Sequence, residues 1–450
     1  MKFWLSFLSA LAIGRSSLAQ ELIFQYRVPG TISASATVEG VAEVNGHVFV
    51  IFNRQGTGSI TKLSLAGQEL GVTAKNQNQT IFGRGLKAYP AKDGVVALTT
   101  DNTKPDADIS AKVFSAENLE VTLDTVTGMK GNVGCFLVAK TSGDIVVSSN
   151  TALTTAIGGI NSNGDKKLTV DAPSPAAAKV IDCPILSADE STLYYVETTP
   201  TFENFIQSIN MADGALIAAS SPPFGIVQRG PALSPDGTHV YVSAVKSSNT
   251  ETTSGSENYL SRFNADSLTE RFDVATEKRY TSFVQNPLVS PDGTIVYLFA
   301  VDFIVAVQAS DGTTVWEFDV TDTLYTPPYL SKDGSQLIFA RITRPESLLF
   351  LDALTGEILG TPLVLPQHLV LGIALVVVNE AEDRIYVTVP GGDSVFAVTN
   401  PSIATLVPTP ETAAPTSSGR KVGNVLAIID TPMTMIAAFA PMVMVSLFWF

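Results

Sequence analysis

The sequence has few basic residues and few histidines, and it lacks the short motifs of several enzyme classes. Of its 450 residues, 28 are Lys or Arg and 43 are Asp or Glu, which gives a net charge of −15. Nucleic-acid binding needs a basic surface facing the phosphates, so this balance argues against a nucleic-acid partner. His47, His239 and His368 form no metal-ligand spacing, and we therefore expect no metal site. We find no Gly-x-Ser-x-Gly nucleophile elbow and no phosphate-binding loop.

The most informative feature present is an internal repeat. Eight times an acidic or glycine turn is followed directly by a strand rich in β-branched and aromatic residues, most clearly at 234–242, 290–298 and 331–339. Successive turns lie 41 to 56 residues apart, with a period near 48. Each unit has a second turn, so that it contains four strand-sized segments. A repeat of this length with four strands is typical of a β-propeller blade.

The repeats predict an all-β fold, an eight-bladed β-propeller. A seven-bladed ring with a degenerate segment is the alternative, because the third unit, 135–170, is the least like the others. The eighth unit lacks its outer strand, whereas residues 23–28 match the polar and apolar alternation of the outer strand at 315–320. We therefore expect an N-terminal strand to complete the last blade and close the ring, with a free N-terminal arm as the alternative.

Both ends of the chain carry predicted targeting segments. A basic Lys2, an apolar stretch at 3–14 and small residues up to Ala19 predict a signal peptide over 1–19. The propeller domain is expected over 20–400. Residues 401–419 are rich in Pro, Thr and Ser, which is typical of an extended stalk that buries no core.

The segment 420–450 is predicted to be a signal for a glycosylphosphatidylinositol (GPI) anchor. Small residues at Ser417, Ser418 and Gly419 offer attachment positions, and an apolar stretch follows at 431–450. A transmembrane helix is the alternative. In the orientation that a signal peptide imposes, basic residues should follow a membrane span, yet Arg420 and Lys421 precede it. The placement of charge therefore favours the anchor and a location on the outer face of the plasma membrane.

Cys135 and Cys183 are 48 residues apart, which is one blade period. Both lie near the start of the first strand of their repeats, so they can meet between neighbouring blades. A disulfide is expected if the compartment is oxidising, and two buried thiols are the alternative. The sequon at Asn78 predicts N-glycosylation in a surface loop of a secreted protein.

The second turn of the repeat resembles the repeat of the pyrroloquinoline-quinone (PQQ) propeller family, best at 305–316 and again at 349–359. The resemblance implies eight blades and covers blades four to seven better than blades one to three. Some members are quinoprotein dehydrogenases that hold PQQ and calcium, and others are non-catalytic scaffolds such as the bacterial outer-membrane assembly propeller. The dehydrogenases carry adjacent cysteines and a tryptophan at the quinone. Here the cysteines are far apart and Trp316 lies on a predicted outer strand, so the resemblance favours a non-catalytic member without cofactor.

Polar residues precede the first strand of several repeats, where a propeller chain reaches the mouth of the central channel. They are Arg84, Asp182, Arg229 and Asn286. These four are the candidate ligand-binding residues, and hydration of the channel is the alternative role. The sequence thus predicts a secreted, anchored, monomeric cell-surface propeller that binds a protein or a glycan as a binding or scaffold module. A PQQ-dependent oxidoreductase is the first alternative, and a hydrolase or lactonase on the same scaffold is the second.

Overall fold

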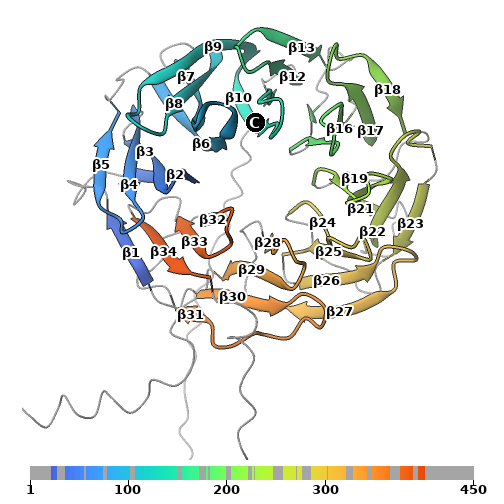
Figure 1. Cartoon of the computed structure of the whole chain (residues 1–450). Helices are drawn as coiled ribbons and strands as arrows, with labels where there is room; N and C mark the ends of the chain where they lie inside the picture. Colours follow the sequence, from blue (N-terminus) through green and yellow to red (C-terminus); the bar gives the residue numbers. More distant parts are fainter. Residues whose placement is uncertain are drawn as a thin grey trace, which may run out of the picture. The chain divides into compact units, whose positions relative to one another are not determined.

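Radially arranged β-sheets make up the computed structural model of the chain (Figure 1). The structure describes residues 22–27, 36–54, 57–73, 79–101, 107–150, 155–171, 179–180, 183–198, 204–220, 226–227, 229–246, 257–269, 271–275, 285–301, 303–320, 328–341, 347–364, 375–388 and 394–400. Within these residues the strands form eight antiparallel sheets around a common centre, and the one helical segment is a short 3-10 turn at Pro90–Lys92. The predicted eight-bladed β-propeller is confirmed.

The first four blades follow one another along the chain, each running from the centre outward. Blade 1 consists of β2 (Ala36–Val44), β3 (His47–Arg54), β4 (Thr57–Ser64) and β5 (Glu69–Val72). Blade 2 consists of β6 (Gln79–Tyr89), β7 (Gly94–Asp101), β8 (Asp108–Ser115) and β9 (Val121–Lys130). Blade 3 consists of β10 (Asn132–Val138), β11 (Ile145–Asn150), β12 (Thr155–Ile160) and β13 (Lys166–Asp171). Blade 4 has a divided inner strand, β14 (Lys179–Val180) with β15 (Ile185–Leu186), then β16 (Thr192–Thr198), β17 (Asn204–Asn210) and β18 (Leu216–Ala219).

The remaining blades complete the ring. Blade 5 also has a divided inner strand, β19 (Ile226–Val227) with β20 (Ala232–Leu233), then β21 (His239–Lys246), β22 (Glu257–Asn264) and β23 (Arg271–Ala275). Blade 6 consists of β24 (Leu288–Val289), β25 (Ile295–Phe299), β26 (Phe303–Gln308) and β27 (Thr314–Asp319). Blade 7 consists of β28 (Tyr329–Leu330), β29 (Gln336–Arg341), β30 (Ser347–Asp352) and β31 (Leu363–Val364). Blade 8 consists of β32 (Leu375–Val378), β33 (Arg384–Thr388), β34 (Ser394–Thr399) and β1 (Leu22–Arg27).

The two middle strands of a blade are buried on both faces, because each blade packs between two others. Every residue of β25 is buried, whereas the outer strand β27 of the same blade places Trp316 inward and leaves Val315 exposed. This difference explains why the middle strands read as continuous apolar runs and the outer strands alternate. The hydrophobic clusters lie between blades. One of them joins Tyr297 and Trp316 of blade 6 to Phe339 of blade 7.

The N-terminal strand closes the ring, as the alternation predicts. β1 pairs with β34 in antiparallel register, so residues from opposite ends of the propeller share one sheet. Phe24 and Tyr26 on the inner face of β1 join the hydrophobic cluster between blade 8 and blade 1. The Tyr26 hydroxyl donates a hydrogen bond of 2.6 Å to the Glu69 carboxylate on the outer strand of blade 1. β1 therefore completes blade 8 and also contacts the blade that follows it in the ring.

The turn between the first two strands of blades 4 to 7 repeats one hydrogen-bond pattern. In blade 5, the Ser234 hydroxyl donates to Asp236 Oδ1 at 2.6 Å, and the Thr238 amide donates to the same oxygen at 3.0 Å. Led by the Ser234 bond, these donors lower the pKa of Asp236 to about 2. Equivalent Ser to Asp bonds occur at Ser187, Ser290 and Ser331. The repeated turn that marks the blades in the sequence is thus a self-contained local structure.

Gly237, in the first turn of blade 5, and Gly356, in the turn after β30 of blade 7, should differ in the cost of replacement by alanine. Gly237 and Gly356 both have a left-handed φ, +73° and +74°, but a Cβ at 237 meets no atom within 4 Å, whereas one at 356 lies 2.6 Å from Trp316 Cδ2. Gly237→Ala should lower the free energy of unfolding by about 1 to 2 kcal/mol from backbone strain alone. Gly356→Ala should cost about 1 to 3 kcal/mol more, because the indole must move. Chemical denaturation of both variants measures the difference, and equal costs would contradict the packing of Trp316 on this turn.

Candidate functional site

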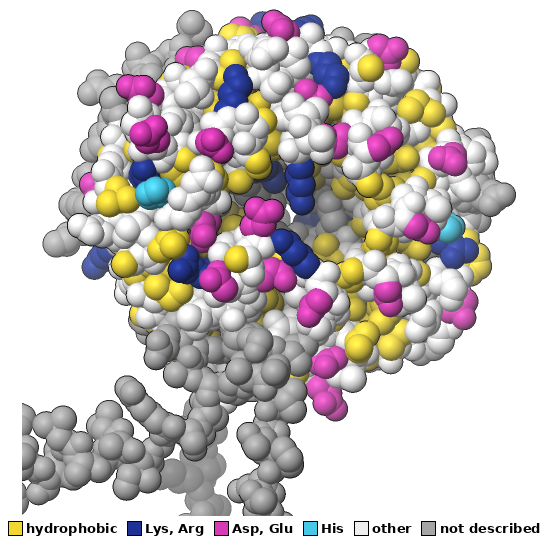
Figure 2. Space-filling view, in the orientation of Figure 1, with side chains coloured by type: hydrophobic (Ala, Val, Ile, Leu, Met, Phe, Trp, Pro, Cys, Tyr) yellow, Lys and Arg dark blue, Asp and Glu magenta, His cyan; other side chains and the backbone are white. Residues whose placement is uncertain are grey.

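A cavity of about 310 Å³ lies where the inner strands of the blades converge. Its wall draws on β2, β6, β10 and β32 and on the segments that lead into the inner strands of blades 4, 6 and 7. The lining residues are Gly40, Val41, Leu86, Lys87, Val133, Gly134, Cys135, Phe136, Cys183, Gln285, Asn286, Leu288, Pro328, Leu375 and Val377. Figure 2 shows a hollow at the centre of the ring with both basic and acidic side chains around it. The cavity is therefore the candidate ligand site.

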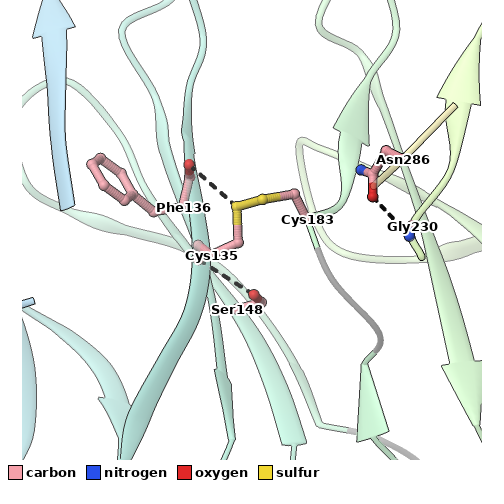
Figure 3. The surroundings of a disulfide bond; sticks show 6 residues. All are labelled: Cys135, Phe136, Ser148, Cys183, Gly230 and Asn286. Carbon is pink, nitrogen blue, oxygen red and sulfur yellow. Dashed lines mark hydrogen bonds between the residues drawn. A yellow bond between two sulfur atoms is a disulfide. The ribbon is translucent and has the colours of Figure 1, made fainter. Parts of the chain in front are cut away.

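Of the four predicted channel residues, the structure places Asn286 on the cavity wall. Its Oδ1 accepts a hydrogen bond of 3.0 Å from the Gly230 amide, which joins the start of blade 6 to the inner segment of blade 5 (Figure 3). Arg229 precedes Gly230 and is partly buried. The backbone of Arg84 belongs to β6, in the stretch where the register with β7 shifts. Asp182 lies outside the described residues, so the binding role of the four together stays a prediction.

Cys135 and Cys183 form a disulfide, as their spacing predicts. The bridge joins β10 of blade 3 to the residue two positions before β15 of blade 4, with the two Cα atoms 5.1 Å apart (Figure 3). The Ser148 hydroxyl donates to the Cys135 carbonyl at 3.3 Å, which ties the bridged strand to β11. Both cysteines line the cavity. The disulfide therefore fixes two neighbouring parts of the cavity wall relative to each other.

Sequence reasoning did not single out Lys87 of β6. Its Nζ lies 5.6 Å from the centroid of the Phe136 ring on the neighbouring blade, a cation–π arrangement. Burial lowers the pKa of Lys87. The signal in the sequence is a single lysine between Leu86 and Ala88 in a predicted inner strand, which does not reveal that the strand borders a cavity.

The Glu43 carboxylate lies where blades 1 and 8 meet, and residues of the propeller bind it. Glu43 of β2 accepts a hydrogen bond from the Tyr386 hydroxyl and lies 3.8 Å from the Arg384 guanidinium. Burial, followed by the hydrogen bond to Glu43, raises the pKa of Tyr386 above its usual range. Glu43 and Tyr386 are 343 positions apart in sequence, so their contact depends on closure of the ring. These contacts hold blade 1 and blade 8 together, which is a structural role.

A second depression, of about 560 Å³, opens between the turns of blades 5 and 6. It is lined by Asp236, His239, Arg262 and Asp292 among others. The Arg262 guanidinium donates to the carbonyls of Ala309 and Ser310 at 2.8 and 3.1 Å. The two aspartates bind the serine and threonine side chains of their own turns. We call this depression the blade 5/6 groove.

The described residues offer neither a metal centre nor a membrane-spanning helix. No group of three or more His, Cys, Asp or Glu side chains there could hold a metal ion. No helix in the described part of the chain is long and apolar enough to cross a membrane. Asn78, Ser417, Ser418 and Gly419 lie outside the described residues, as do 1–19 and 401–450.

Solved structures with the same architecture are numerous. The crystal structure of BamB from Moraxella catarrhalis superposes with a TM-score of 0.56 at 13% identity, covering 84% of this chain and 99% of that one. The Dos1 propeller superposes with a TM-score of 0.56 at 10% identity, covering 84% of this chain and 94% of that one. The shared feature is the β-propeller fold. No protein-family model and no curated protein matches the sequence.

The likeness to these propellers covers the blades and carries no information about the cavity wall, because identity is so low. Function must therefore be argued from the residues of this chain. The most informative of them are Lys87, Phe136, Asn286 and the Cys135–Cys183 bridge, which come from four different blades and meet at one cavity.

Proposed function

We propose that this propeller is a binding or scaffold module, displayed on the outer cell surface by a C-terminal lipid anchor and engaging a protein or glycan on its face. The observation that carries the proposal is the closed ring itself. The turns between the first two strands of neighbouring blades are each held by a Ser to Asp hydrogen bond. Together they form a rigid face that contains the blade 5/6 groove. Rigid elements that present side chains without reorganisation are suited to recognition.

The predicted targeting segments at both ends of the chain, together with the disulfide, support the proposed location on the cell surface. A signal peptide at 1–19 would send the chain into the secretory pathway, where a disulfide such as Cys135–Cys183 persists. The stalk at 401–419 would hold the ring away from the membrane, and the signal at 420–450 would be replaced by the anchor. The resemblance of the repeats to the PQQ propeller family, whose non-catalytic members are scaffolds, agrees with a binding role.

Site-specific photo-crosslinking on intact cells tests the binding role. A photoreactive amino acid replaces Ser310, an exposed residue at the blade 5/6 groove, and in a matched control it replaces Leu216, which is 60% exposed on the outer strand of blade 4. We expect irradiation to give a discrete adduct with a surface protein or glycan from position 310 and none from position 216. Equal adducts from the two positions, or none from position 310, would contradict binding at this face.

A further inference from the structure

Lys87 is a cation without a counter-ion among the described residues. Other partly buried basic side chains have oxygen partners: Lys62 Nζ donates to the Glu117 carbonyl at 2.6 Å, and Lys167 pairs with Asp144. Lys87 has the Phe136 ring at 5.6 Å, and no carboxylate of the described chain lies within ion-pair distance of it. An ammonium group removed from water is costly unless it is paired, and this cost is what lowers the pKa of Lys87. Within the described part of the chain, the positive charge of Lys87 is therefore not balanced.

The cavity around Lys87 has the size and lining of a ligand site. Its volume of about 310 Å³ is at the lower end of the range of about 300 to 1,000 Å³ found for small-molecule sites. Apolar walls come from Leu86, Leu288, Leu375 and Val377. A ligand that fits must therefore be small and must present an apolar body together with its charge.

A second hydrogen-bond donor comes from blade 6, four blades away from Lys87 in the ring. The Oδ1 of Asn286 is occupied by the Gly230 amide at 3.0 Å, so the orientation of this side chain is fixed. Figure 3 shows the amide nitrogen of Asn286 pointing away from Gly230. Because both Asn286 and the cysteines line the cavity, a fixed donor and a fixed wall border the same space as the lysine.

We propose that the central cavity binds a small, partly apolar organic acid, with the Lys87 ammonium as counter-ion to its carboxylate and the Asn286 amide as a polar group on the opposite wall. A single cation suits a single carboxylate, whereas a phosphate dianion usually requires several charged donors. The Phe136 ring and the disulfide hold the surrounding wall in place before binding, which lowers the entropic cost of association. This inference does not depend on the partner proposed for the face that contains the blade 5/6 groove.

The carboxylate can belong to a free organic acid or to the C-terminus of a peptide. Calorimetric titration of the purified full chain separates the two sources, with benzoate and its neutral isostere benzamide as one pair of probes. The second pair is acetyl-Gly-Phe with a free acid terminus and the same dipeptide with an amide terminus. We expect saturable binding of at least one acid and no binding of its neutral counterpart. Benzoate binding assigns the site to free acids, and binding of the peptide acid alone assigns it to a peptide terminus.

Lys87→Met removes the charge while keeping most of the length of the side chain, and it should weaken binding of the acid about tenfold or more. Lys112→Met is the matched control, because Lys112 is in the same blade but pairs with Asp124 at 2.9 Å on the blade surface.

A second readout uses the wild-type chain only. The bound acid should slow acetylation of Lys87 by an amine-reactive ester, as measured by peptide mapping. Equal binding of acids and amides, absence of binding by either acid, or undiminished binding by Lys87→Met would overturn the proposal.

Discussion

Replacing Phe24 by alanine should destabilise the whole propeller, although the residue lies on a six-residue strand at the N-terminal edge of the described chain. Phe24 is 7% exposed and packs in the cluster that joins blades 8 and 1, with its ring centroid 6.5 Å from that of Tyr386. Truncation of a buried phenylalanine costs about 3 to 5 kcal/mol. Because β1 protects β34 and also contacts blade 1, the loss should lower the stability of the entire ring.

Gln25→Ala is the matched control for this prediction. Gln25 belongs to the same strand, keeps the same backbone pairing with Phe396, and has an exposed side chain. Its loss should change the free energy of unfolding by no more than about 0.5 kcal/mol. Denaturant unfolding followed by tryptophan fluorescence measures both variants. Similar, small effects of the two substitutions would show that β1 is not an integral part of blade 8.

Removing the disulfide should have an effect of comparable size. Cys135 and Cys183 close a loop of 48 residues, and the chain-entropy model assigns about 4 kcal/mol to a loop of that length. The double variant Cys135→Ser, Cys183→Ser should therefore unfold at a markedly lower denaturant concentration than the wild type. Reductant should lower the stability of the wild type in the same way and leave that of the double variant unchanged. A wild-type transition that does not respond to full reduction, verified by alkylation, would contradict the stabilising role of the bridge.

The features that the sequence predicted correctly are local or periodic. Asp236 and Gly237 mark their turn because the hydrogen bonds that stabilise it lie within five residues, so each copy carries its own signal. The closing strand was recognisable because its alternation, with Phe24 and Tyr26 inward, is the pattern that any half-buried outer strand must have. The disulfide followed from the period, since residues one blade apart occupy equivalent places in adjacent sheets.

The features that sequence reasoning missed depend on which distant segments converge. Lys87 is an ordinary lysine in a predicted strand until β6 is placed beside Phe136 and opposite blade 6. The divided inner strands of blades 4 and 5 were likewise missed, because each pairs with β16 or β21 through two short stretches whose positions the repeat does not specify. The position of Asn286 at the central cavity could be predicted because the repeat defines the position before the inner strand, whereas its binding role stays a prediction. Its hydrogen bond with Gly230, 56 residues away, could not be inferred.

The proposed location of this ring, outside the cell on a lipid anchor, can be tested by peptide mapping of the mature protein from washed membranes. If the anchor is attached as proposed, the last peptide should end at Ser417, Ser418 or Gly419 and carry an ethanolamine-linked glycan, with no peptide recovered from 431–450. The same map should begin at Gln20. Recovery of an unmodified peptide that spans 431–450 from the mature protein would contradict the anchor and indicate that the segment is retained.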